Sequence, residues 1–376
     1  MNYTTRDTCI FCDYHLSTPY FSQDHTAPVA HYPVEADTAL GTMTVIPYNI
    51  FKCPDCKTVQ TKYLGNLNEV YKTNHADSTG TTMTNLHKLN LEFILKYKDS
   101  IKNIIEIGSS KGVLADDILS NLDTKYFIIE PSYIGDRRDK TIIENFYENV
   151  DDTRIDANTL IISHVLEHFY EPKKIIEKIT NNTNITNFFL VFPDLEYYIN
   201  HNILHVLNSE HTFYIDNNFL IKLMEAHGFS LIEQLPYAGH SVLFYFQRKK
   251  QISTPVEINF FNIKHDVEVF FTKIKNTATF FNNIATSKKK VYIWPASAHS
   301  LCLLGFGLEE KNLTGMLDNS PLKIGKKMYG TDLLISDFND KIKDDSVVLL
   351  NGGPFNSEVE EKLKQNKTEY YTHPAI

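Results

Sequence analysis

The 376-residue sequence predicts an α/β protein built on a doubly wound, mostly parallel sheet, and three observations support this prediction. Short apolar runs of strand length alternate with stretches of helical periodicity, as expected for buried parallel strands between helices. At roughly 100–200 residues per domain, the length indicates two or three domains. Hydrophobic residues make up 42% of the chain and charged residues 22%, so there is enough apolar material for complete cores.

The apolar runs divide the chain into three regions. Residues 1–80 have little sustained periodicity and predict a loop-rich arm. Residues 81–250 carry the first α/β alternation, a polar linker over 247–255 follows, and residues 256–376 carry a second, smaller alternation. The predicted strands lie at 103–107, 125–130, 159–162, 187–192, 291–294, 312–317 and 346–350.

Charge and hydropathy exclude several partners. The chain has 37 Lys and Arg against 46 Asp and Glu, a net charge of -9, so nucleic acid is not an expected partner. No apolar run approaches the length of a membrane span, and the first residues lack the apolar segment of a secretory signal. We therefore expect a cytoplasmic protein with no membrane partner, of an oligomeric state that the sequence does not indicate.

Four of the five cysteines form two C-x-x-C pairs, Cys9 with Cys12 and Cys53 with Cys56. Five cysteines are too few for a disulfide scaffold in a chain of this length, so the spacing is interpreted as ligand spacing. Each two-residue gap lets both sulfurs bind one tetrahedral ion, and four thiolates leave no position for water. The pattern predicts a structural zinc ion, whereas Cys302, in an apolar run, is expected to be a buried small hydrophobe.

A strand followed by a small-residue turn begins at Ile104, and the helical stretch 113–122 follows it. In this turn Gly108, Ser109 and Gly112 allow a ligand to approach the backbone closely. Glu130 ends the next strand, 22 residues after Gly108, where a carboxylate can accept hydrogen bonds from both ribose hydroxyls. The turn is neither G-x-G-x-x-G nor a P-loop, so the pattern favours a small nucleoside over a phosphate cradle.

These residues, with Ser163-His164-Val165-Leu166-Glu167-His168 after a third strand, resemble the class I S-adenosylmethionine-dependent methyltransferases. More narrowly, the cysteine pairs, this core and the segment 317–330 resemble the sugar C-methyltransferases of deoxysugar biosynthesis. The resemblance implies a zinc-binding domain at 1–80, a methyltransferase core at 81–250 and a Rossmann-like domain at 256–376. It also implies S-adenosylmethionine and structural zinc as cofactors, and a sugar or nucleotide-linked sugar as the acceptor, with methylation at carbon.

The resemblance also assigns roles to single residues. It implies contacts to the methionine part of the cofactor, to its ribose and to the methyl-transfer cleft, and a catalytic Glu-His pair whose histidine takes a proton from the sugar. The residues implied for the cofactor are Glu106, Gly108, Ser109, Gly112, Glu130, Ser163 and His164, and those implied for catalysis are Glu210 and His211. A histidine suits this role because its pKa lies near working pH.

The chain departs from that family at three places. Asn208 and Ser209 stand where the family has Tyr-His, and the segment 74–80 has no counterpart of an acceptor-contacting tyrosine, so that His75 is expected on that side of the pocket. The segment 295–300 lacks the family's Gly-Ala-x-x-Lys-Gly turn, which favours a wall for the acceptor over a phosphate site and leaves His299 without an assigned role.

Four alternatives remain open at this level. The string from His164 to His168 matches H-x-x-E-H, in which both histidines of one helix face bind zinc and Glu167 acts as the base of a protease. A sugar O-methyltransferase, a nicotinamide-dependent sugar oxidoreductase and a non-catalytic cofactor-binding protein would use the same fold. Binding of S-adenosylmethionine against NAD separates the oxidoreductase from the others.

Overall fold

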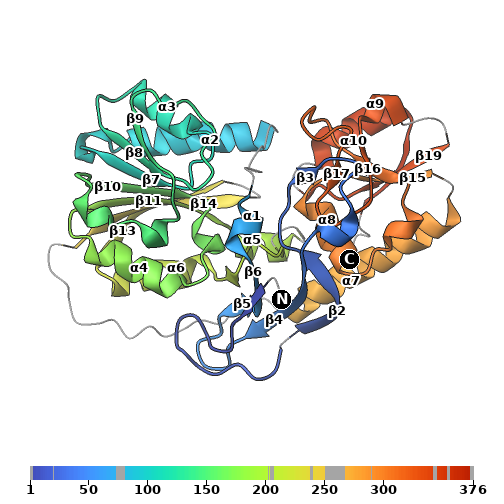
Figure 1. Ribbon diagram of the computed structural model, residues 1–376, viewed down its shortest axis with the longest axis horizontal. Helices are drawn as coiled ribbons and strands as arrows, with labels where there is room; N and C mark the ends of the chain where they lie inside the picture. Colours follow the sequence, from blue (N-terminus) through green and yellow to red (C-terminus); the bar gives the residue numbers. More distant parts are fainter. Residues whose placement is uncertain are drawn as a thin grey trace.

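In the computed structural model, the described residues are 3–19, 21–72, 81–201, 203, 207–237, 240–249, 267–288, 290–341, 345–353 and 356–372. Two α/β units lie side by side, and the N-terminal strands lie at the junction between them (Figure 1). No helix among these residues is long and apolar enough to cross a membrane.

The first α/β unit is built on a seven-stranded sheet with the order β13-β14-β11-β10-β7-β8-β9. The strands are β7 (Ile104–Ile107), β8 (Tyr126–Ile129), β9 (Lys140–Ile143), β10 (Thr159–Ser163), β11 (Asn187–Pro193), β13 (Phe229–Tyr237) and β14 (Ser241–Arg248). Strands β7 to β11 are parallel to their neighbours, whereas β14 is antiparallel to both β11 and β13. The predicted doubly wound sheet is confirmed. Because the strand order reverses between β7 and β10, a ligand site is expected where these two strands end.

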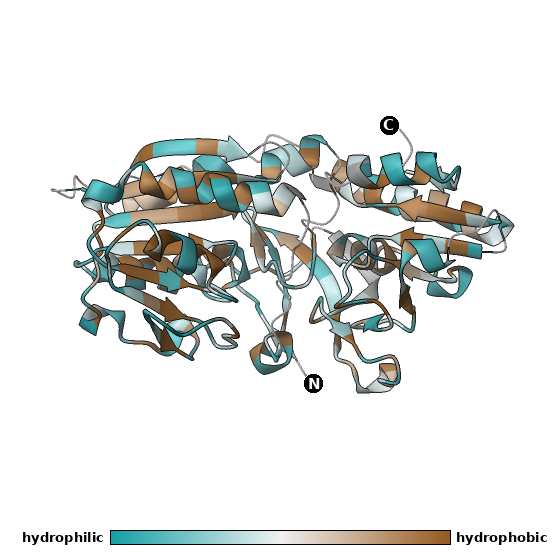
Figure 2. Cartoon of the chain, turned by 90° about the horizontal axis from the view of Figure 1, so that it is seen from above, coloured by the Kyte–Doolittle hydropathy of each residue, from teal (hydrophilic) through white to brown (hydrophobic). Residues whose placement is uncertain are grey.

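Helices cover both faces of this sheet (Figure 1). Helices α2 (Thr81–Leu95) and α3 (Val113–Leu119) pack on one face, and α4 (Pro172–Asn181) and α6 (Asn217–Ala226) pack on the other. In β14, Phe244 and Phe246 face α4 and α6, whereas Leu243 and Tyr245 face α2 and α3. Residues of both sets are buried, which explains why the strands are continuous apolar runs. Figure 2 shows the same distribution, with hydrophobic strands beneath helices that have hydrophilic outer faces.

The described part of residues 1–80 holds more regular structure than the expected loop-rich arm. Strands β2 (Phe21–Pro28), β4 (Val45–Lys52) and β5 (Val59–Thr61) form an antiparallel sheet, and β12 (Phe213–Tyr214) completes it. Two further pairs are β1 (Tyr3–Thr5) with β6 (Tyr63–Gly65), and β3 (Pro33–Val34) with β17 (Lys327–Met328). A short helix, α1 (Leu67–Val70), follows β6. The N-terminal strands therefore pair with strands from both later regions of the chain.

The second α/β unit has a five-stranded parallel sheet with the order β18-β16-β15-β19-β20. Its strands are β15 (Lys290–Trp294), β16 (Gly315–Leu317), β18 (Ile335–Ser336), β19 (Ser346–Leu350) and β20 (Glu369–Tyr371). Helices α7 (Val267–Ser287) and α8 (Ala298–Gly305) pack on one face, and α9 (Phe338–Lys341) and α10 (Asn356–Gln365) lie on the other. Cys302 is buried in α8, as predicted.

The predicted linker begins too early. Gln247 and Arg248 are the last residues of β14, and the Arg248 guanidinium donates hydrogen bonds to the carbonyls of Ile185 and Thr180 at 2.7 and 3.0 Å. The charge of Arg248 suggested that this residue lies in a solvated linker. In the structure its guanidinium is instead hydrogen-bonded to main-chain carbonyls near the end of α4. Residues 250–255 lie outside the described part of the chain.

Candidate active site

The turn after β7 requires glycine at two positions. Gly108 and Gly112 have φ values of 74° and 72°, in the left-handed region that favours glycine. A Cβ atom at Gly108 would lie 2.3 Å from Cγ2 of Val165, and one at Gly112 would lie 2.6 Å from the Tyr133 hydroxyl. The turn therefore packs directly against the segment that follows β10 at Gly108 and against the segment that follows β8 at Gly112, and a larger residue at either position would push the segments apart.

Glu130, at the end of β8, is held by the backbone of this turn. One carboxylate oxygen accepts a hydrogen bond from the N–H of Ser110 at 3.1 Å, and the other accepts one from the N–H of Ser132 at 3.0 Å. The carboxylate is fixed in orientation, and each oxygen keeps a lone pair for a further donor. This is the arrangement that two neighbouring ribose hydroxyls need.

A cavity of about 240 Å³, here called the main cavity, opens at the switch point between β7 and β10. It combines aromatic rings with carboxylates and imidazoles. Its lining consists of Leu67, Tyr71, Ile107, Gly108, Ser110, Ile129, Glu130, Pro131, Ser132, Phe146, Tyr147, Glu148, His164, Val165, His168, Phe169 and Glu210. Among the described residues that line it, none belongs to the C-terminal unit, where a wall for the acceptor was expected.

A second cavity, of about 170 Å³, adjoins the same turn. Glu106, Ser109 and Ser163 line it together with residues of α2, and Gly108 and His164 line both cavities. The residues implied for the cofactor thus surround one turn but are divided between two spaces. Gly112 lines neither cavity and instead precedes the first residue of α3.

Glu106 is a buried carboxyl group beside this second cavity. The Tyr126 hydroxyl donates a hydrogen bond to it at 2.9 Å. Burial raises the pKa of Glu106 to about 7, and the charges of Glu130 and Asp116 act in the same direction, while the Tyr126 hydrogen bond and Lys140 oppose them. A cationic group placed beside Glu106 would favour its ionised form.

A cluster of three histidines surrounds Glu167, which is 1% exposed and lies in a single 3-10 turn, Leu166–His168. Oε1 of Glu167 lies 3.4 Å from Nδ1 of His164 and 4.0 Å from Nε2 of both His168 and His211. Burial alone would raise the pKa of Glu167, but the hydrogen bond from His164 and the three nearby imidazoles outweigh it and lower this pKa to about 2. Glu167 is therefore ionised throughout the physiological range.

Glu210 lines the main cavity, and it is paired with a residue that the sequence did not indicate. Its Oε1 lies 2.7 Å from Nδ1 of His31, and its Oε2 lies 3.9 Å from Nδ1 of His168. The departures at 208 and 209 also have a structural role. Oδ1 of Asn208 accepts hydrogen bonds from the N–H groups of Glu210 and His211, both at 2.9 Å, and the Ser209 hydroxyl donates to the carbonyl of Pro28.

His211 lies beside the main cavity's residues but is not part of the described lining. Its ring packs edge-on against His168, with 5.0 Å between the ring centres. Burial, followed by the charge of His168, lowers the pKa of His211 to about 3, so the imidazole is neutral at physiological pH. Of the predicted catalytic pair, Glu210 faces the cavity and His211 lies next to Glu167.

Two further residues bring the N-terminal region into the site. His31 reaches Glu210, and Tyr71 lines the main cavity, where its carbonyl accepts a hydrogen bond from the Ser132 hydroxyl at 2.6 Å. No spacing or motif in the sequence marks either residue. The expected contact of His75 lies outside the described residues, and His299 is buried in the C-terminal unit, where desolvation and Lys323 lower its pKa to about 3.

The H-x-x-E-H protease arrangement is wrong. His164 and His168 do not share a helix face, because the 3-10 turn begins only at Leu166 and His164 has a φ of 53°. Nε2 of His164 is 2.9 Å from the hydroxyl of Ser241, which lies in β14. The string lies in a connection between a strand and a turn and not on a helix, so its histidine spacing does not form the protease zinc site.

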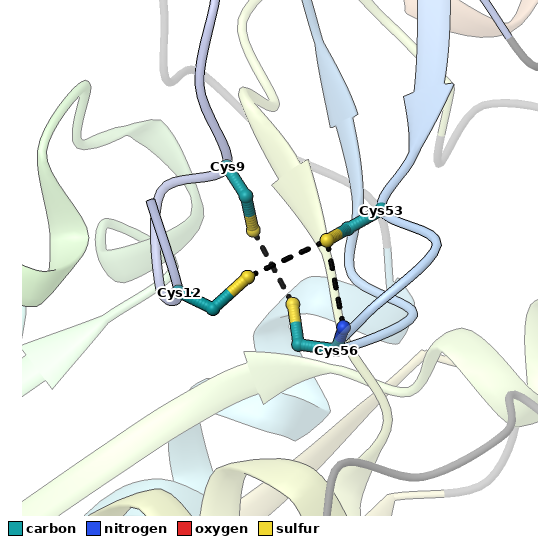
Figure 3. Close-up of side chains that lie close together, drawn as sticks. All are labelled: Cys9, Cys12, Cys53 and Cys56. Carbon is teal, nitrogen blue, oxygen red and sulfur yellow. Dashed lines mark hydrogen bonds between the residues drawn. The ribbon is translucent and has the colours of Figure 1, made fainter. Parts of the chain in front are cut away.

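The four predicted zinc ligands converge on one point (Figure 3). All four sulfurs lie within 4.8 Å of one another, with 3.3 Å between Cys9 and Cys56 and 3.4 Å between Cys12 and Cys53. Ligands at 2.3 Å from a tetrahedral ion lie about 3.8 Å apart, so the donor type and spacing fit zinc. Phe11, between the first two cysteines, packs against Phe213 and Phe219 and anchors this cluster to α6.

A family model described as a methyltransferase domain matches residues 82–234, which include the glycine turn, Glu130 and the Glu210–His211 pair. With this match, the sheet order and the glycine turn define a class I methyltransferase fold. Residues 82–234 therefore carry a methyltransferase domain, which supports an S-adenosylmethionine-dependent methyltransferase over the oxidoreductase alternative.

Solved structures similar to parts of the chain include two proteins named as methyltransferases and one domain solved with SAH. The N-methyltransferase NodS from Bradyrhizobium japonicum WM9 is 10% identical, with 46% of this chain and 99% of that chain covered and a TM-score of 0.35. The N-terminal domain of EvdMO1, solved with SAH and D-fucose, is 11% identical over 46% and 85%, with a TM-score of 0.33. An O-methyltransferase family protein from Burkholderia thailandensis is 11% identical over 44% and 56%, with a TM-score of 0.35. No curated protein sequence matches the chain.

Proposed function

We propose that this methyltransferase acts on a sugar, free or linked to a nucleotide, and that the Glu210–His211 pair receives the proton that the acceptor loses. The observation that carries the proposal is that Glu130 and Glu210 line the same cavity at the strand switch point. The Glu130 carboxylate suits the ribose of the cofactor, and the Glu210 carboxylate lies in the same cavity, where it can contact the acceptor. When bound, S-adenosylmethionine supplies an electrophilic methyl group on a sulfonium centre.

The residues present fit this cofactor. The fixed Glu130 carboxylate would hold the ribose hydroxyls, and the glycine turn lets the ligand approach the backbone between β7 and α3. Glu106, Ser109 and Ser163, in the adjoining cavity, would hold the amino acid part, since Glu106 can balance a positive charge there. His164 lines both cavities and lies where the two parts of the ligand would meet.

The composition of the main cavity supports a sugar as the acceptor. Tyr71, Phe146 and Phe169 offer aromatic faces, on which the C–H faces of a sugar ring can pack. Glu210, His164 and His168 offer hydrogen-bonding groups for hydroxyls in the same space. Linkage of the sugar to a nucleotide and methylation at carbon are supported by the family resemblance.

The chain's own residues would remove one proton from the acceptor. For a carbon acceptor next to a carbonyl, the C–H proton goes to the Glu210–His211 pair, and the resulting enolate carbon forms the new C–C bond as the sulfur–methyl bond breaks. For a hydroxyl acceptor, the O–H proton goes to the same pair and oxygen forms the bond. In both cases the cavity would hold the two reactants in line, so that the cofactor would supply its methyl group to the acceptor and be left as a neutral thioether.

The test is incubation of the purified chain with S-adenosylmethionine and a panel of keto-sugars, hydroxy-sugars and their nucleotide-linked forms, followed by mass spectrometry. We expect one methyl group to be added to a sugar, with a turnover that falls in Glu210→Gln and His211→Ala. Transfer only to non-sugar acceptors would overturn the proposal, and cofactor binding without transfer to any class would favour the non-catalytic alternative.

A second measurement separates carbon from oxygen methylation. Deuterium exchange from solvent into the acceptor carbon, without cofactor and dependent on His211, indicates enolate formation. An active enzyme that causes no such exchange favours a sugar O-methyltransferase.

A further inference from the structure

We propose that Glu167, His168 and His211 bind a divalent transition-metal ion at the wall of the main cavity, in addition to the ion expected at the four cysteines. These three residues offer one carboxylate oxygen and two imidazole nitrogens, all within 4.8 Å of one another. The inference deepens the proposed function and rests on it for the role of the ion, because the ion would contact the acceptor.

The distances leave room for an ion between the ligand atoms. Nε2 of His168 and Nε2 of His211 both lie 4.0 Å from Oε1 of Glu167. Metal–ligand bonds of 2.0–2.2 Å place neighbouring ligands about 3.0–3.5 Å apart, so a movement of roughly half an ångström completes the site. The other oxygen of Glu167 is buried and has no hydrogen-bond partner among the described residues. Binding of the ion by both carboxylate oxygens would give this oxygen a partner.

The groups behind these three residues match the usual support of a metal site. A metal-binding histidine normally directs its second nitrogen to a carboxylate. Nδ1 of His168 lies 3.9 Å from Oε2 of Glu210, while Glu210 is itself paired with His31 at 2.7 Å. Glu167 in turn accepts a hydrogen bond from Nδ1 of His164 at 3.4 Å, and Nε2 of His164 is bonded to the Ser241 hydroxyl. Glu167 thus has an oriented neighbour, whereas the 3.9 Å between His168 and Glu210 exceeds a hydrogen bond and would have to shorten when the ion binds.

The donor set indicates the kind of ion and its role. Two imidazoles and one carboxylate suit Zn²⁺, Fe²⁺ or Ni²⁺ better than Mg²⁺ or Ca²⁺, which prefer oxygen ligands. Three protein ligands leave a coordination position open, unlike the four cysteines, and His168 lines the main cavity. An acceptor oxygen can bind at the open position, where the ion stabilises the negative charge of an alkoxide or an enolate. His211 would then act as a ligand, and Glu210 would remain as the group that takes the proton.

The experiment counts metal ions and identifies where they bind. The full chain, stripped with chelator and shown to be folded by its binding of S-adenosylmethionine, is titrated with Zn²⁺ and, separately, with Co²⁺. We expect two equivalents to bind, and the Co²⁺ spectrum to show thiolate charge transfer for one equivalent and only d–d bands for the other. Glu167→Gln and His168→Ala should bind one equivalent and keep the thiolate band, whereas His201→Ala, which removes an exposed histidine, should still bind two.

Saturation of the wild-type protein at one equivalent of either ion would overturn the proposal. Retention of the second equivalent in both Glu167→Gln and His168→Ala would also overturn it. These results are independent of the sugar assay. A chain that methylates a sugar while binding only the ion at the cysteines would support the proposed function and refute the second metal site. A chain that binds two ions but methylates no sugar would support the second metal site and refute the proposed function.

Discussion

Replacing Glu130 by alanine tests the position of the cofactor most directly. The carboxylate makes two hydrogen bonds to backbone N–H groups, from Ser110 and Ser132, and we place two ribose hydroxyls on its remaining lone pairs. A hydrogen bond to a charged group contributes about 1.5–3 kcal/mol, but water enters the space that alanine leaves and replaces part of this. We therefore expect a net loss of about 2–3 kcal/mol in binding free energy, which corresponds to roughly a 30- to 150-fold weaker Kd.

Isothermal titration calorimetry with S-adenosylmethionine and with its demethylated product measures this change. Glu130→Gln should also weaken binding, because an amide can accept from only one of the two N–H groups and places its own NH₂ group against the other. Glu144→Gln is the matched control, since Glu144 is exposed and paired with Arg137. An affinity within twofold of wild type for Glu130→Ala would mean that the ribose does not lie on this carboxylate and would refute the reasoning.

Three further predictions concern metal, pH and catalysis. Removal of zinc by chelator, or Cys53→Ser, should lower the stability of the N-terminal sheet while the seven-stranded sheet stays folded. Hydrogen exchange measures the stability of each sheet separately. Protein that contains no zinc after purification without chelator would contradict this prediction. The pKa of Glu106 is raised from 4.5 to about 7, so the folded state loses stability as pH rises from 4.5 to 7 and this carboxyl group ionises. The ionised form favours the cationic cofactor, so cofactor binding should strengthen by up to about tenfold for each pH unit as pH rises toward 7. Calorimetry against pH should show this slope in the wild-type protein and not in Glu106→Gln. His211→Ala should reduce sugar turnover by roughly 10²- to 10⁴-fold with little change in cofactor affinity. Glu210→Gln should cost less than this where His211 is the base, and at least as much where His211 is a metal ligand and Glu210 takes the proton. The metal content of His211→Ala separates the two cases.

Local sequence was sufficient for the sheet of the methyltransferase core. Strands such as 104–107 and 187–193 are apolar at nearly every position because helices cover both faces, so their composition alone marks them. The sequence also predicted that the glycine turn and Glu130 lie close together, because one strand–helix–strand unit has a nearly constant length. The cysteine pairs could be assigned for the same reason, since each pair of ligands lies within one tight turn.

The N-terminal sheet shows where local pattern failed. In β4, Ile46, Tyr48 and Ile50 are buried and alternate with more exposed residues, a weak signal of a half-buried strand. The same sheet includes β12, which lies in the sequence after the core strand β11 and pairs with Val59 and Gln60 of β5. A pairing of this kind depends on the docking of two units, and no local periodicity encodes it.

By itself the sequence determined the class of fold, the glycine turn after the first core strand and the four-cysteine group, because each depends on residues close together in the chain. Only the tertiary structure brought His31 to Glu210 across 179 positions, Tyr71 to the main cavity, and His211 to the Glu167–His168 segment. The physical reason is that these contacts form where strand ends, a turn and the N-terminal segment meet, and their geometry depends on how the units pack. Residue types and spacing along the chain do not specify that packing.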